Sequence, residues 1–72
     1  MTKTNSKVIE SLVKIINKDN NMVKVYDYTN DINYLVNKLT GDTKLLVNSY
    51  LNDYRTGTVS NNSFRKILKR MI

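Results

Sequence analysis

Residues 60–72 read SNNSFRKILKRMI and carry the clearest helical pattern of this 72-residue chain. Apolar side chains recur there at the i, i+3, i+4, i+7 spacing that places them on one helical face. These apolar positions are Phe64, Ile67, Leu68 and Met71. The other faces carry the cations Arg65, Lys66, Lys69 and Arg70. The stretch therefore predicts an amphipathic, strongly basic helix.

The N-terminal quarter of the chain predicts a second helix, which begins after an N-cap at Ser6 and ends in the polar residues 18–21. Its apolar positions are Val8, Ile9, Leu12, Val13, Ile15 and Ile16. Because this stripe is wide, the helix is expected to lie centrally in the core. Residues 1–5 before it are predicted to form a flexible leader.

A third helical pattern occupies the middle of the chain. Thr29 or Asn30 supplies its N-cap, and Asp31 in the first turn suits the positive end of the helix dipole. Its apolar positions are Ile32, Leu35, Val36 and Leu39. Gly41 stands where a left-handed residue would close the helix.

The fourth helical pattern follows directly, with Asp42 or Thr43 as its cap and Gly57 at its end. Its predicted apolar stripe consists of Leu45, Leu46, Tyr50, Leu51 and Tyr54. After Gly57, Val59 precedes the cap Ser60 and is expected to pack against Phe64 as a hydrophobic staple.

Residues 22–28 read MVKVYDY and have the β-branched and aromatic content of a strand. The only other extended candidate is the Thr58–Val59 pair, so the segment forms either a short strand or β-bridge with that pair or a connector across the helices. The patterns together predict an all-α fold: one domain over residues 6–72, a compact bundle of about four short helices with at most this short strand.

The composition excludes several kinds of site. The chain contains neither cysteine nor histidine, which excludes a disulfide framework and effectively excludes structural zinc. Catalysis would need a desolvated pocket for an acid, lysine or serine, and a helical domain of this size has little room for one. We therefore expect a non-catalytic protein without a metal or cofactor.

The positive charge is concentrated at one end of the sequence. Residues 55–72 carry five cations and no acid, net +5, whereas residues 1–54 carry seven lysines and six acids, net +1. Such an asymmetry predicts a polyanionic partner or an acidic protein surface.

Two local motifs compete for residues 52–68. An EF-hand loop with Gly57 at its sixth position would have the right apolar spacing, but its ligand positions hold no carboxylate, so calcium is not expected. A helix-turn-helix or winged-helix-like unit would instead use residues 43–55 as support and residues 60–72 to face DNA. The predicted nucleic-acid contacts are then Arg55, Asn61, Asn62, Arg65, Lys66, Lys69 and Arg70. The same residues also fit a capped first turn followed by a solvated basic face.

A tyrosine group in the middle of the chain suggests another binding surface. Tyr26, Tyr28 and Tyr34 lie among aspartates, and tyrosine is enriched in protein interfaces. The alternative is that these rings only cover a small core. Residues 25–54 carry four aspartates and two lysines, net −2, which would permit head-to-tail self-association with the basic end.

These observations lead to two functional hypotheses. The first is a non-catalytic nucleic-acid-binding accessory or regulatory protein, with DNA as the favoured partner. The second is a protein-binding inhibitor or adaptor, or a small structural subunit of an assembly. The abundance of residues with AT-rich codons suggests a phage or mobile element of a low-GC bacterium. Glu10 and Lys14 interrupt the first apolar run before it could span a bilayer, so a location in the bacterial cytoplasm is expected.

Overall fold

The computed structural model describes residues 2–19 and 26–72. They form four helices, α1 (Lys3–Asp19), α2 (Thr29–Lys38), α3 (Gly41–Thr56) and α4 (Asn61–Arg70). The predicted all-α bundle of four helices is therefore confirmed. No strand occurs in the described ranges, and residues 58–59 form a bend instead. The strand alternative for residues 22–25 lies outside the described residues.

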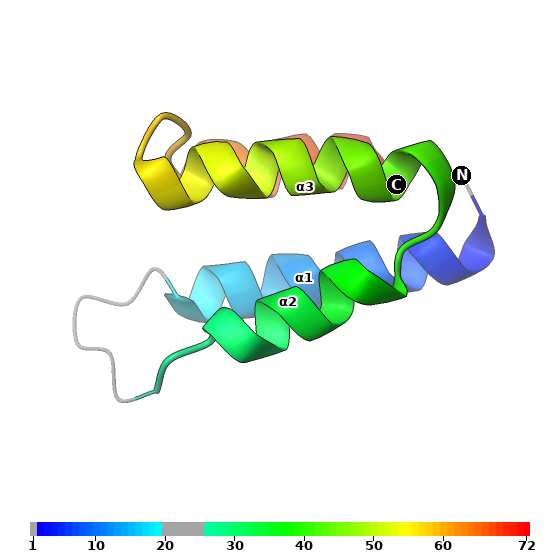
Figure 1. Ribbon diagram of the computed structural model, residues 1–72, viewed down its shortest axis with the longest axis horizontal. Coiled ribbons are helices and arrows are strands. Elements are labelled where there is room, and N and C mark those ends of the chain that lie inside the picture. The colour runs from blue at the N-terminus through cyan, green and yellow to red at the C-terminus, as the bar shows by residue number, and fades with distance from the viewer. Residues whose placement is uncertain (1, 20–25) are drawn as a thin grey trace.

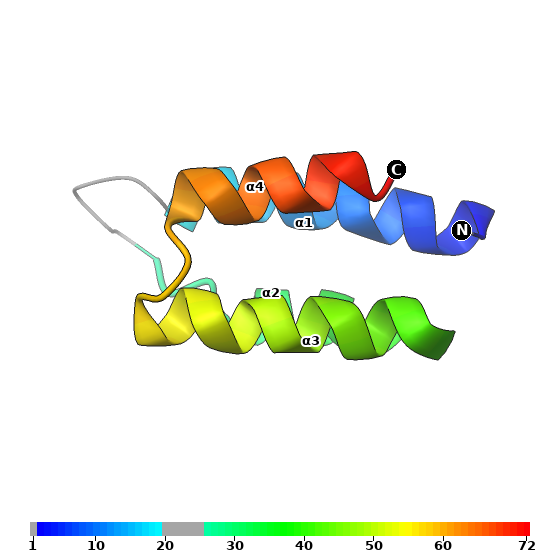
Figure 2. The same cartoon turned by 90° about the horizontal axis from the view of Figure 1, so that it is seen from above.

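Each helix runs antiparallel to the one before it, so the chain folds as an up-and-down bundle (Figure 1). The helices lie in two layers. One layer contains α1 and α4, and the other contains α2 and α3 (Figures 1 and 2). α1 packs against α2 and α4, and α3 packs against the same two helices. Short connections between successive helices favour this antiparallel arrangement.

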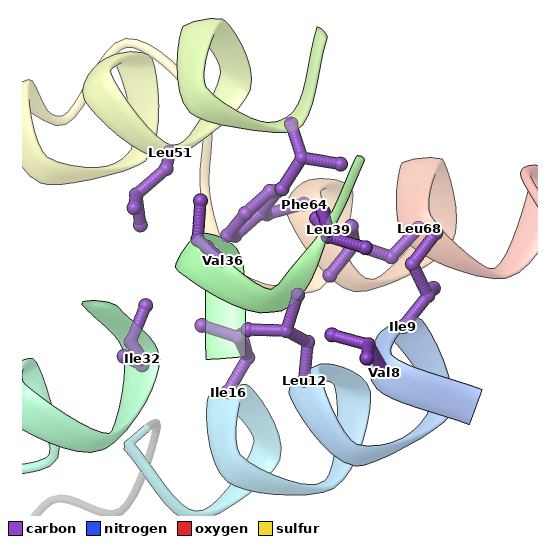
Figure 3. Close-up of a cluster of buried hydrophobic side chains, with 11 residues drawn as sticks. Val8, Ile9, Leu12, Ile16, Ile32, Val36, Leu39, Leu51, Phe64 and Leu68 are labelled. Atoms are coloured by element: carbon purple, nitrogen blue, oxygen red, sulfur yellow. The ribbon is translucent and has the colours of Figure 1, made fainter. Parts of the chain in front are cut away.

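Among the described residues, the core is a cluster of eleven buried apolar side chains (Figure 3). α1 supplies four of them, more than any other helix, which agrees with its wide apolar stripe. Phe64 and Leu68 of α4 are fully buried, as the spacing in residues 60–72 predicts. Phe64 also stacks on Tyr54 of α3, with ring centroids 5.2 Å apart, and so joins the two layers. The basic helix is thus an integral part of the core.

α1 begins three residues before the predicted cap at Ser6. The hydroxyl oxygen of Thr2 accepts a hydrogen bond from the Asn5 backbone N–H at 3.1 Å. The Asn5 side chain is buried, and it both donates to the Thr40 carbonyl and accepts from the Thr40 N–H, each at 3.2 Å. This pair satisfies the backbone between α2 and α3, which explains why residues 3–5 of the predicted leader belong to the helix.

The predicted boundary between the second and third helices is also displaced. α2 ends at an extended Leu39, and Thr40 holds the N-cap position of α3. Gly41 has φ +65° and begins α3 rather than closing α2, so Asp42 lies within the first turn. Glycine suits this place because a positive φ is costly for residues with a Cβ.

At the start of α2, Thr29 is the first helical residue rather than the cap. Its backbone N–H donates to an Asp27 carboxylate oxygen at 3.0 Å. The predicted end of α3 and the predicted N-cap of α4 are both confirmed. Gly57 has φ +86° at the end of α3, and the Ser60 hydroxyl oxygen accepts a hydrogen bond from the Ser63 N–H at 3.1 Å. Val59 packs against the core, as its staple position requires.

The predicted stripe of α3 is half right. Leu51 is buried and Tyr50 and Tyr54 pack against the core, but Leu45 and Leu46 are 68% and 47% exposed. The fully buried residue in their place is Val47. Val47, Leu51 and Tyr54 repeat at i, i+4, i+7, and this face is the one that α2 and α4 cover.

Candidate nucleic-acid interface

The cations of α4 lie outside the core because Phe64 and Leu68 set the orientation of the helix. Lys66, Lys69 and Arg70 are exposed, and Arg65 is half-buried. α4 contains no acidic residue. Among the described residues, no ion pair joins an aspartate of α3 to a cation of α4. In the part of the chain that the structure describes, the aspartates of α3 therefore do not neutralise the cations of α4.

α1 adds a second set of cations to the layer that it forms with α4. Its lysines are Lys3, Lys7, Lys14 and Lys18, and all four are exposed. The helix carries two acids, Glu10 and Asp19. The α1–α4 layer therefore holds eight cations and two acids, net +6, which equals the net charge of the whole chain. The cations of this layer are divided equally between α1 and α4.

The α2–α3 layer is neutral. Its acids are Asp31, Asp42 and Asp53, and its cations are Lys38, Lys44 and Arg55. The two layers therefore differ in charge although they contribute to one core. The predicted acidic stretch, residues 25–54 with net −2, includes Asp27 before α2 and excludes Arg55 at the end of α3, which accounts for the difference from these two helices.

The structure does not bring Arg55 together with the cations of α4. The Arg55 guanidinium donates to the side-chain oxygen of Asn33, which lies on α2. Since α2 and α4 are diagonal to each other in the bundle, this contact holds Arg55 on the neutral side (Figures 1 and 2).

α3 and α4 lie side by side and antiparallel, as a helical hairpin (Figures 1 and 2). In a helix-turn-helix the second helix crosses the first at a large angle. The predicted helix-turn-helix arrangement is therefore wrong. The buried face of α4, with Phe64 and Leu68, is what aligns the two helices.

The first turn of α4 is tied to its neighbours by hydrogen bonds. The Asn61 side-chain N–H₂ donates to the Ile16 carbonyl at 2.8 Å and to the Tyr54 hydroxyl at 3.0 Å. The Asn61 side-chain oxygen accepts from Nε of Arg65 at 2.8 Å. The Tyr54 hydroxyl in turn donates to the Asp19 carboxylate. Asn61 thus connects α1, α3 and α4, whereas Asn62 is exposed.

The environment of Tyr54 changes its acidity. Burial raises the pKa of the Tyr54 hydroxyl to about 12, and its hydrogen bond to Asp19 acts in the same direction. The hydrogen bond from Asn61 opposes this rise because it would stabilise the phenolate. The hydroxyl therefore stays protonated near neutral pH and remains the donor to Asp19.

A shallow pocket of about 240 Å³ lies on the same layer, between α1 and α4. Its lining consists of Glu10, Val13, Lys14, Lys69 and Ile72. Lys14 and Lys69 therefore flank one depression although they are 55 positions apart in the sequence. The acid Glu10 lines the same depression as these two lysines.

The predicted tyrosine surface is divided. Tyr26 and Tyr28 form an edge-to-face pair with ring centroids 4.8 Å apart, and Tyr26 is 52% exposed. A hydrogen bond to Asp31 raises the pKa of Tyr26. Tyr34 is 61% exposed on α2, and Nζ of Lys38 lies 4.6 Å from its ring centroid. The structure pairs the first two rings, while Tyr34 pairs with a lysine.

The lysines of α1 are the residues that sequence reasoning missed as part of the site. Their spacing of four, seven and four residues is a helical periodicity that places them on one face. That signal was present, but only the packing of α1 beside α4 gives it meaning.

Comparison with protein-family models, curated proteins and solved structures finds no match to this chain. Within the described residues, no group of three or more metal-ligating side chains occurs. None of the four helices is both long and apolar enough to cross a membrane.

Proposed function

We propose that this chain is a non-catalytic nucleic-acid-binding accessory or regulatory protein that contacts phosphates through the α1–α4 layer. The observation that supports it is the charge segregation: the layer carries net +6, and the α2–α3 layer carries none. A one-sided field of this kind attracts a polyanion and orients the protein toward it.

The contacts are expected to be with the backbone rather than with base edges. Asn61 and Asn62 are the two asparagines predicted to pair with adenine, and the side chain of Asn61 is engaged with Ile16, Tyr54 and Arg65. Asn62 is exposed. The Ser63 side-chain oxygen accepts a hydrogen bond from the Ser60 hydroxyl at 3.0 Å in the cap of α4. Binding therefore depends on salt and little on sequence. The chain is rich in amino acids that are encoded by AT-rich codons. On this basis we propose that it is a phage or mobile-element protein that acts in the bacterial cytoplasm.

The test is fluorescence anisotropy with labelled duplex DNA, single-stranded DNA and RNA at a series of salt concentrations. Two variants with the same net charge of +3 are compared. One removes α4 cations, Lys66→Gln, Lys69→Gln and Arg70→Gln. The other removes the cations of the neutral layer, Lys38→Gln, Lys44→Gln and Arg55→Gln. The first should lower the log–log salt slope on duplex DNA by up to about 2.7, at about 0.9 per phosphate contact, and the second should change it little.

The matched net charge separates a defined surface from general attraction. Equal losses in both variants would contradict a defined surface, and no binding of the wild type at low salt would contradict the function itself. In that case the exposed tyrosines favour the second candidate, a protein-binding inhibitor, adaptor or structural subunit that uses Tyr26, Tyr28 and Tyr34. A Tyr26→Ser, Tyr34→Ser variant that loses a captured partner would support that candidate.

A further inference from the structure

We propose that Arg65 is the preorganised phosphate-binding group of the α1–α4 layer and that Asn61 is its positioning residue. This inference rests on the proposed function and adds the chemistry of one contact. It predicts that Arg65 recognises a phosphate oxyanion through a fixed pair of donors, whereas the other cations of α4 act through charge.

A chain of hydrogen bonds fixes the Arg65 guanidinium. Its Nε donates to the Asn61 side-chain oxygen at 2.8 Å, one helical turn away. Asn61 cannot swing away because its N–H₂ group is held by the Ile16 carbonyl at 2.8 Å and by the Tyr54 hydroxyl at 3.0 Å. Three helices therefore determine where one guanidinium lies.

The hydrogen bond at Nε leaves the two terminal amino groups of the Arg65 guanidinium without a bond to Asn61. Arginine has five N–H donors in a planar fork, and Nε supplies one of them. Within the described part of the chain, the two terminal amino groups of Arg65 have no protein acceptor. These groups suit two oxygens of a phosphate in a bidentate contact. Holding the plane in advance reduces the side-chain entropy lost on binding.

The neighbouring cations differ from Arg65 in this respect. Lys66, Lys69 and Arg70 are exposed, and in the described residues none has a side-chain hydrogen bond. They can neutralise phosphates, but each must order a long flexible side chain to do so. Arg65 and Arg70 are thus two arginines on one helix, and only the Arg65 side chain is held by a hydrogen bond in the described residues. They form a matched pair for an experiment.

The experiment compares Arg65→Lys with Arg70→Lys, using labelled duplex and single-stranded DNA. Both variants keep the net charge, so the salt slope should stay unchanged in both. Arg65→Lys should weaken binding about tenfold because lysine cannot make the fork contact. Arg70→Lys should change the affinity less than about twofold, since its contact is electrostatic. Equal effects of the two substitutions would overturn the proposal.

A double-mutant cycle tests the role of Asn61. Asn61→Ala should weaken binding about threefold or more when Arg65 is present and have no further effect in the Arg65→Lys background. Additive losses would show that Asn61 contributes independently of Arg65 and would contradict its positioning role. Circular dichroism checks that each variant is folded, and the comparison of Arg65→Lys with Arg70→Lys decides the proposal if Asn61→Ala is unfolded. If the wild type binds no nucleic acid at all, the proposed function fails; if it binds and the two lysine variants agree, only this inference fails.

Discussion

The two layers of the bundle share one core and differ in charge. The α1–α4 layer carries net +6, and the α2–α3 layer, with three cations and three acids, carries none. Of the five exposed large apolar residues in residues 2–19 and 26–72, four lie on or next to the neutral layer: Tyr26, Tyr34, Leu45 and Leu46. One side of the molecule is therefore suited to a polyanion, and the other is not.

This difference shows that the unit of function is a pair of helices distant in sequence. Measured along the chain, the basic end includes Arg55 and excludes the lysines of α1. Measured in space, Arg55 belongs to the neutral layer through its contact with Asn33, and Lys14 lies beside the same pocket as Lys69. Substitutions at the contacts between the layers, and at the charges by which the layers differ, test this difference.

The largest effect is expected where the layers are joined. Phe64→Ala removes a fully buried ring that stacks on Tyr54 and should lower the free energy of unfolding by about 3–5 kcal/mol. A chain of this size has roughly 4–11 kcal/mol in total, so this loss is a large fraction of its stability. Urea denaturation followed by far-UV circular dichroism measures the loss. Leu45→Ala, at a 68% exposed position, is the control and should stay within about 0.5 kcal/mol.

The second test concerns charge on α1. Lys7→Gln, Lys14→Gln and Lys18→Gln together should lower the salt slope of binding to duplex DNA by up to about 2.7, because these lysines belong to the same surface as α4. The neutral-layer variant with Lys38, Lys44 and Arg55 replaced by Gln has the same net charge and is the control. A slope that stays at the wild-type value would limit the binding surface to α4. That result would contradict a surface formed by α1 and α4 together.

The smallest effect is expected at the polar junction of α1, α3 and α4. Tyr54→Phe removes the hydroxyl that bonds Asp19 and Asn61 and should cost about 1–2 kcal/mol. The pKa of Tyr54 is raised to about 12 in the folded protein, above its ordinary value near 10. Between these values the unfolded state loses the proton before the folded state does, so stability falls as pH rises. The advantage of the wild type over Tyr54→Phe should be complete below pH 10 and decline toward about pH 12.

Denaturation of the wild type and Tyr54→Phe in parallel across this pH range isolates the tyrosine, because the lysines titrate equally in both proteins. A difference in stability that does not change with pH would contradict the assignment of the raised pKa to Tyr54.

Local patterns in the sequence were sufficient where a helix carries its own signals. The spacing of Phe64 and Leu68, the cap at Ser60 and the left-handed Gly57 all depend on neighbours within one turn. Predictions failed where the partner is distant. Asn5 extends α1 because it bonds Thr40, and Leu45 is exposed because α2 and α4 cover the Val47 face of α3 instead.

The sequence by itself determined the number and type of helices and the fact that the chain is cationic, since hydrophobic periodicity, caps and charge are local properties. Only the tertiary structure decided which cations form one surface and which are separate. It placed α1 beside α4, turned Arg55 toward Asn33, and engaged Asn61 with α1 and α3. The physical reason is that burying the apolar faces sets the rotation and the neighbours of every helix, and the charged side chains follow from that choice.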